Sequence, residues 1–173
     1  ADADRATAAC GLCSTSFLGV DGEGGGKFAD AASVAAAVAA QWRGEGDRLV
    51  VITGGEPLLQ LDAPLIAAFK AEGFSIAVET NGTLEPPEGD LWLTVSPKAD
   101  APFVLKCGNE LKLVYPQAGA EPEKFEGLAF DHFFLQPMDS PERAKNTALA
   151  TEYCLAHPQW RLSLQTHKII GIR

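Results

Sequence analysis

The feature that most constrains the fold of this chain is the alternation of short apolar runs with segments of helical periodicity. RLVVIT at residues 48–53 is a β-branched run typical of a buried strand, and FSIAVET at 74–80 is a second one. Between them, apolar residues recur at helical spacing until Gly73, which is expected to end the helix. Strand, helix and strand in this order predict a βαβ unit with parallel strands.

The same alternation continues toward the end of the sequence. Further strands are expected at residues 91–96, 110–115, 132–136 and 160–165. Two more helices are expected, at 30–42 behind an N-capping aspartate and at 141–157, where Leu149, Tyr153 and Ala156 should share one face. Strands that are buried on both faces and separated by helices predict an α/β fold with a largely parallel sheet, open or curved into part of a barrel.

Composition narrows the class of ligand. The chain has 173 residues, which is one domain's worth, and a formal net charge of −9. Nucleic acid and anionic membranes would be repelled by most of such a surface, so a small molecule is the expected ligand. The sequence has no apolar run of about 18 residues and no signal peptide at its start, and we expect a soluble, cytoplasmic protein.

The four cysteines are expected to be reduced thiols. Cys10 and Cys13 form a CxxC pair near the start, whereas Cys107 and Cys154 stand alone, the latter in a helical pattern that favours the core. A CxxC pair can hold half of a tetrahedral metal site, close a redox disulfide or bind part of an iron–sulfur cluster.

Each predicted strand runs into polar or glycine- and proline-bearing residues. Because the carboxyl ends of parallel strands meet at one edge of a sheet, these residues should converge on one ligand. They are Thr53, Glu56, Glu79, Asn81, Ser96, Lys98, Gln136, Asp139 and His167. Glu79 lies in an otherwise apolar strand, where an unpaired carboxylate is costly, so it is expected to meet an ammonium or hydroxyl group of the ligand.

TGGEP at residues 53–57 is the most informative of these stretches. Two glycines directly after a strand permit close approach of the backbone to a ligand, and Pro57 fixes the chain as it leaves. The stretch lacks the Gly-Lys-Ser/Thr ending of a Walker loop and the three-glycine spacing of a dinucleotide fingerprint. Nucleoside triphosphates and NAD are therefore not the expected ligands.

CGLC, TGGEP and ETNG, in this order, resemble the motifs of the radical S-adenosylmethionine (SAM) enzymes. With CSTSFLGVDGE, TGGEPLLQLD, ETNGTL, VSPKAD, NELKLV, FLQPMD and HPQWRLSLQTHK, the chain resembles the 7-carboxy-7-deazaguanine synthase family from about Cys10 to Arg173. The resemblance implies one radical SAM-like domain over residues 1–173, with a partial (β/α) barrel that is incomplete at the N-terminus.

The resemblance also implies an activity. It is that of a carbon–nitrogen lyase of queuosine and deazapurine biosynthesis, which contracts the ring of 6-carboxy-5,6,7,8-tetrahydropterin to 7-carboxy-7-deazaguanine with loss of ammonia. A [4Fe–4S] cluster, S-adenosyl-L-methionine and Mg²⁺ are the implied cofactors. A reducing electron-donor protein and a second copy of the chain, in a homodimer, are the implied partners.

The resemblance assigns roles residue by residue. Cys10 and Cys13 match cluster ligands, and Thr15 matches the threonine near a substrate-bound Mg²⁺. The positions that match SAM contacts are Gly55, Glu79, Asn81, Ser96, Pro97, Lys98, Gln136, Pro137, Met138 and Asp139. The positions that match substrate contacts are Thr53, Gly54, His167 and Arg173. No residue is assigned as a proton or hydrogen donor.

The match differs from the family in one respect. The family binds its cluster through three cysteines, and the first lies on a longer loop upstream of the CxxC pair, after the strand that opens the barrel. We expect Ala1 to lie inside that loop and the native synthase to be longer. These 173 residues alone are expected to bind the cluster poorly and to be catalytically impaired or inactive. Cys107 is not expected to replace the third ligand, because its position has no counterpart.

Two other readings of the CxxC pair are weaker. A noncatalytic binding module would complete a zinc site with another chain or with His132 or His157, but the sequence has no second close pair of ligands. A thioredoxin-like dithiol enzyme would place the pair after a strand at the start of a helix, whereas here a glycine-rich loop follows it. Neither reading explains the polar strand ends.

Overall fold

The computed structural model describes residues 25–172, which form two compact units. In the described part of the chain, unit 1 comprises residues 25–80 and Leu84–Leu93, and unit 2 comprises Asn81–Thr83 and residues 94–172. The expectation of a single domain over residues 1–173 stays a prediction.

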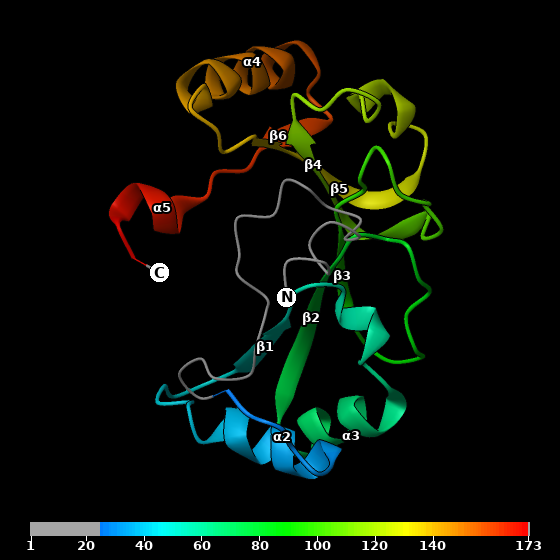
Figure 1. The fold of residues 1–173 in the computed structure, drawn as a ribbon, viewed down its shortest axis with the longest axis vertical. Coiled ribbons are helices and arrows are strands. Elements are labelled where there is room, and N and C mark those ends of the chain that lie inside the picture. The colour runs from blue at the N-terminus through cyan, green and yellow to red at the C-terminus, as the bar shows by residue number, and fades with distance from the viewer. Residues whose placement is uncertain (1–24, 173) are drawn as a thin grey trace. The chain divides into compact units, whose positions relative to one another are not determined.

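Unit 1 is the βαβ unit predicted from the sequence, preceded by a helix (Figure 1). Its elements are α2 (Ala31–Ala39), β1 (Arg48–Ile52), the 3-10 turn η1 (Pro57–Leu59), α3 (Ala63–Ala71) and β2 (Phe74–Thr80). β1 and β2 pair in parallel, with Val50 opposite Ile76. Both helices begin at an aspartate: the Asp30 carboxylate accepts from the Ser33 N–H at 2.8 Å, and Asp62 accepts from Leu65 N–H at 2.9 Å.

The two faces of the unit 1 strands are not alike. Ile76 and Val78 of β2 are buried in a core that α2 and α3 supply, in which the Phe74 ring meets Phe69 edge to face at 6.0 Å. On the other face, Leu49 and Val51 of β1 are half exposed. The expectation of strands buried on both faces is therefore wrong for the described part of this unit, where helices cover only one face.

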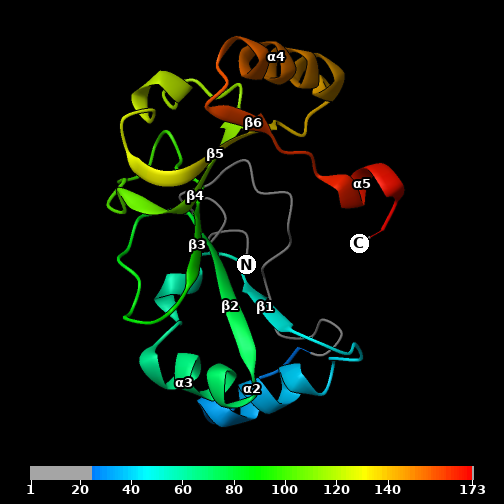
Figure 2. The ribbon, with the colours of Figure 1, turned by 180° about the vertical axis from the view of Figure 1, so that it is seen from behind.

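Unit 2 contains the longer run of parallel strands. Its elements are β3 (Trp92–Val95, of which the last two residues belong to this unit), β4 (Cys107–Tyr115), η2 (Pro122–Lys124), β5 (Ala129–Pro137), α4 (Arg143–Ala156), β6 (Trp160–Leu162) and α5 (Thr166–Ile170). β4 pairs with β3 and β5, and β5 pairs with β6, all in parallel. Figure 2 shows β6 continuing through a short connection into α5, which the sequence patterns did not predict.

The core of unit 2 lies between its sheet and α4. Leu111, Leu113 and Leu135 are completely buried, and Phe133 packs against the Trp160 ring at 5.3 Å.

The helix expected at residues 141–157 is present as α4. Asn146 and Ala150 are its buried residues, Tyr153 is half-buried, and Leu149 and Ala156 are exposed. The most buried face of α4 is therefore the one that carries Asn146 and Ala150.

The α/β class is confirmed: within residues 25–172 there are six strands in parallel pairings, and the sheet that these residues form is not closed, as expected of a partial barrel. No helix within residues 25–172 is long and apolar enough to cross a membrane.

Replacing Leu135 with alanine should lower the free energy of unfolding by about 2–5 kcal/mol, because a completely buried side chain would be removed from the centre of unit 2. Leu155→Ala is the matched control, since Leu155 is 81% exposed and its loss should cost about 0.5 kcal/mol or less. Chemical denaturation of both variants measures the difference. Equal effects of the two substitutions would contradict the described packing.

Candidate functional site

The predicted site residues follow the carboxyl ends of strands in both units. In unit 1, Thr53, Gly54, Gly55 and Glu56 follow β1, and Glu79 lies at the end of β2. In unit 2 they are Asn81, Ser96, Pro97, Lys98, Gln136, Pro137, Met138, Asp139 and His167. Cys10, Cys13, Thr15 and Arg173 lie outside the described residues. Convergence of all these strand ends on one ligand stays a prediction.

Glu56 joins the two strand ends of unit 1. Its Oε1 accepts from the Leu58 N–H at 3.0 Å, which caps η1, and from the Thr80 hydroxyl at 2.8 Å. Thr80 is buried at the last position of β2. One carboxylate thus fixes the TGGEP loop to the strand that carries Glu79.

The glycines of this loop present their backbone to solvent. Gly54 and Gly55 are exposed, and Gly54 has φ +130°, a conformation that strains any residue with a Cβ. Among the described residues, and apart from its chain neighbours, no atom lies within 4 Å of the place that a Cβ would take at Gly54. Glu79 is exposed as well, so the desolvation argument for its ligand partner is wrong, although a carboxylate at a strand end can still accept from an amino group.

The ETNG turn is built differently, and within unit 2. The Asn81 side-chain oxygen accepts from the Thr83 N–H at 2.9 Å, which is an Asx turn. Gly82 has φ +77°, and a Cβ there would lie 2.7 Å from a methyl group of Val95. Its carbonyl accepts from the Val104 N–H at 2.9 Å, so the turn is held to a following loop.

The segment after β3 is also held by one of its own side chains. The Lys98 ammonium donates to the Ser96 carbonyl at 2.8 Å and to the Ser96 hydroxyl at 2.9 Å. Pro97, between them, is completely buried. The structure therefore brings these three predicted SAM contacts together as one rigid loop.

The segment Gln136–Asp139 leaves β5 along the N-terminal end of α4. Its Met138 N–H donates to the Tyr115 carbonyl at 2.8 Å. The Asn146 side-chain amide, 4% exposed, donates to the Met138 carbonyl at 3.0 Å and to the Ser140 hydroxyl at 3.2 Å. Both backbone polar groups of Met138 are thus fixed.

Asp139 is the charged member of that segment. Its Oδ2 accepts from the Lys168 ammonium at 2.5 Å, and an Arg143 guanidinium nitrogen lies 4.0 Å from Oδ1. The Lys168 hydrogen bond, with the charges of Lys168, Arg143 and His167, holds the pKa of the Asp139 carboxyl below its usual range despite slight desolvation. Asp139 is therefore an anion at neutral pH.

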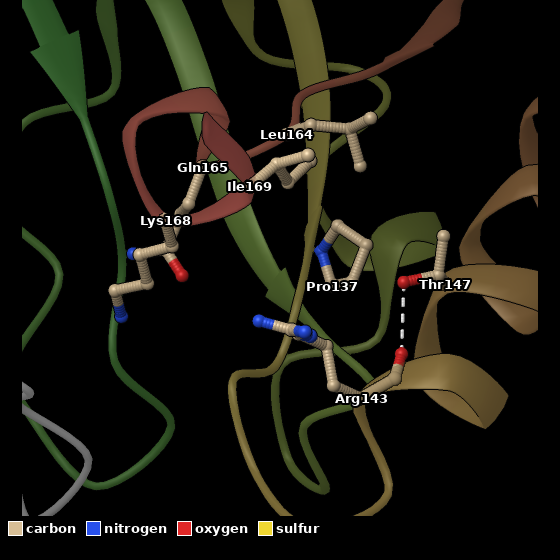
Figure 3. Close-up of a pocket in the computed structure, with 7 residues that line it drawn as sticks. All are labelled: Pro137, Arg143, Thr147, Leu164, Gln165, Lys168 and Ile169. Atoms are coloured by element: carbon tan, nitrogen blue, oxygen red, sulfur yellow. Dashed lines mark hydrogen bonds between the residues drawn. The ribbon is translucent and has the colours of Figure 1, made fainter. Parts of the chain in front are cut away.

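A pocket of about 240 Å³ opens beside this segment, within unit 2 (Figure 3). Pro137, Leu164 and Ile169 give it apolar walls, and Arg143 and Lys168 add positive groups. The remaining lining residues are Thr147, whose hydroxyl donates to the Arg143 carbonyl at 2.8 Å, and Gln165. The pocket therefore combines apolar walls with polar and positively charged groups.

Comparison with known proteins identifies the family. No protein-family model matches the chain. It is 65% identical to the 7-carboxy-7-deazaguanine synthase of Bordetella pertussis, over 99% of this chain and 82% of that protein. It is 63% identical to that of Caulobacter vibrioides, over 98% of this chain and 81% of the relative. The chain belongs to the 7-carboxy-7-deazaguanine synthase family.

A solved structure agrees with this assignment. The crystal structure of QueE from Escherichia coli matches with a TM-score of 0.62 and 34% identity. The match covers 78% of this chain, and 63% of that one, which is less than two thirds of its length. The fold expected from the resemblance to the family is therefore confirmed for most of the chain.

The described residues fit some of the family's cofactors better than others. In unit 1, the exposed Gly54 and Gly55 backbone and the Glu79 carboxylate suit a ligand with an ammonium group, and in unit 2 the Asp139 carboxylate suits an ammonium or hydroxyl donor. For a metal, no group of three or more His, Cys, Asp or Glu residues is close enough within residues 25–172. Cys10 and Cys13 lie outside these residues, so both the iron–sulfur cluster and the zinc alternative with His132 or His157 stay predictions.

Three residues that hold the candidate site together were not predicted from the sequence. Thr80, Asn146 and Lys168 each hold a predicted ligand-contacting segment through a hydrogen bond. A signal was present for Asn146, because a polar residue stands four positions before Ala150 on the inward face of α4. Lys168 adjoins the predicted His167 but lies in a helix that the patterns did not show.

Thr80→Val should lower the free energy of unfolding by about 1–2 kcal/mol. Valine has nearly the same shape as threonine but lacks the hydroxyl that donates to Glu56. Thr80→Ser keeps the hydroxyl and should retain most of the stability. Urea titration compares the two variants. A valine variant as stable as the serine variant would show that the Glu56 contact contributes nothing.

Asn146→Ala should cost about 1–3 kcal/mol, because the Met138 carbonyl would lose its amide donor in a buried place. Lys145→Ala, its neighbour in an exposed ion pair with Glu142, should cost less than about 0.5 kcal/mol. Thermal unfolding of the two variants tests this. Similar losses would mean that Asn146 does not hold the loop.

Proposed function

We propose that the protein is a 7-carboxy-7-deazaguanine synthase, a carbon–nitrogen lyase that contracts the ring of 6-carboxy-5,6,7,8-tetrahydropterin and releases ammonia. The observation that carries this proposal is 60–65% identity to three such synthases over nearly the whole chain. Proteins that share so much sequence over their site motifs commonly share their chemistry. The site geometry described above supports the proposal segment by segment.

The proposed cofactors are a [4Fe–4S] cluster, SAM and Mg²⁺. Cys10 and Cys13 would bind the cluster as thiolates, and Thr15 would approach a Mg²⁺ that the substrate also binds. When bound, the cluster and SAM supply a radical that abstracts hydrogen from the pterin. The protein's own task is to hold these groups in place and to exclude water.

SAM would be held by the strand-end segments. The backbone of Gly55 and the exposed Glu79 carboxylate would receive its amino group, since both offer oxygen acceptors. Asp139 would accept from an amino or hydroxyl donor, because its pKa is lowered and it is ionised at neutral pH. The remaining proposed SAM contacts are Asn81, Ser96, Pro97, Lys98, Gln136, Pro137 and Met138.

The pterin would be oriented by Thr53, Gly54, His167 and Arg173. Thr53 and Gly54 precede the proposed SAM contact Gly55 directly, so substrate and SAM would meet along a single loop. His167 is exposed at the start of α5, where its ring can donate to a substrate oxygen or nitrogen. A reducing electron-donor protein and a second copy of this chain complete the proposal.

Anaerobic reconstitution of the native protein with iron and sulfide tests the proposal. We expect absorbance near the iron–sulfur charge-transfer band and, with a reductant, SAM and the pterin, 7-carboxy-7-deazaguanine detected by mass spectrometry. Bound zinc in place of iron would contradict the proposal and support the binding-module alternative.

Cys13→Ala should abolish most of the bound iron and the charge-transfer absorbance, because a thiolate ligand is lost. Cys107→Ala is the matched control, since Cys107 is exposed at the start of β4 and has no assigned role. Iron and sulfide analysis of both proteins gives the answer. Retention of a full cluster by the Cys13 variant would remove Cys13 from the ligand set.

A further inference from the structure

The Asp139 carboxylate is held by cations from two different helices. Lys168 of α5 donates to Oδ2 at 2.5 Å, whereas the Arg143 guanidinium of α4 lies 4.0 Å from Oδ1, beyond hydrogen-bond distance. The Lys168 side chain is 25% exposed and that of Arg143 is 59% exposed. Lys168 is therefore the closer and better protected of the two partners.

The helix that carries Lys168 is short and well defined at its end. α5 spans Thr166–Ile170 and ends at Gly171, which is in the left-handed conformation with φ +73°. The Ile172 N–H donates back to the His167 carbonyl at 3.0 Å. Through Lys168, this helix is tied to the loop between β5 and α4.

The two carboxylate oxygens of Asp139 differ in their contacts. Lys168 uses Oδ2, and Arg143 is too distant to use Oδ1. Oδ1 thus keeps its capacity to accept from a ligand, while the Oδ2 bond restricts rotation of the side chain. An acceptor that is oriented before the ligand arrives loses less conformational freedom on binding.

We propose that Lys168 is a positioning residue of the SAM site, which orients the Asp139 carboxylate so that it accepts from an amino or hydroxyl group of SAM. This inference rests on the proposed function. Lys168 itself does not contact SAM, and its effect on SAM binding passes through Asp139. Because Arg143 remains when Lys168 is removed, the effect of that removal is partial.

A double-substitution cycle read by calorimetry tests this role. The proteins are the unsubstituted native protein and its Lys168→Met, Asp139→Asn and double variants, each with its cluster reconstituted and titrated with S-adenosylhomocysteine. We expect Lys168→Met to weaken binding about five-fold, which is the size of one partly exposed ion pair. Asp139→Asn should weaken it more, and adding Lys168→Met to Asp139→Asn should change nothing further.

Two further variants separate positioning from a structural role. Lys168→Arg keeps the charge and should bind within about two-fold of the unsubstituted chain. Lys145→Met removes an exposed α4 ammonium, 3.2 Å from Glu142, and should leave binding unchanged. Circular dichroism at the titration temperature establishes that each protein is folded.

The outcomes are distinguishable. Unchanged affinity in Lys168→Met, or a loss that adds fully to that of Asp139→Asn, overturns the positioning role and leaves the proposed function intact. A folded, unsubstituted protein that carries its cluster but binds no S-adenosylhomocysteine overturns the proposed function and this inference with it.

Discussion

Parallel pairing of the strands is the constraint on which the rest of this structure depends. Parallel neighbours need a crossover connection each time, so successive strands of a unit end at the same edge. In unit 2, the loops after β3, β5 and β6 therefore leave one edge of one sheet, although they are far apart in the sequence. In unit 1, the TGGEP loop and Glu79 follow from the same geometry.

The loops at these edges then need fixing, because backbone groups beyond the last ladder bond have no strand partner. Each loop is fixed by a nearby side chain. Glu56 receives an N–H and a hydroxyl, Lys98 donates to the Ser96 carbonyl, and Asn146 donates to the Met138 carbonyl. These polar contacts make strand-end loops precise enough to present ligand-binding groups.

The strands were predictable because a short run of apolar residues is typical of a buried strand. β2 spans residues 74–80 as expected, β1 ends one residue earlier than expected, and β3 is one residue shorter at each end. α5 was not predictable, because five residues carry too little periodicity and no side chain caps the start of the helix. Burial was harder still: Glu79 has apolar neighbours in sequence, yet it alternates to the exposed face of β2.

Some residues of the candidate site could likewise be predicted from the sequence, and others could not. The residues expected to touch ligands stand directly after strands, so their positions followed from the strand pattern together with the family motifs. The residues that hold them came from elsewhere: Thr80 from inside a strand, Asn146 from a helix face and Lys168 from α5. Their partners lie 8 to 29 positions away, and local sequence patterns do not encode such pairings.

The charges at the strand ends favour the proposed cofactor over its alternatives. Lys98 and Lys168 both donate to neighbouring groups of the protein, whereas the Glu79 and Asp139 carboxylates remain partly exposed to solvent. SAM carries a sulfonium and an ammonium group, so a carboxylate in either unit would attract it. The same carboxylates would repel the carboxylate of the proposed pterin. A hard cation between that carboxylate and the protein removes this repulsion, which gives the proposed Mg²⁺ a physical reason to be there.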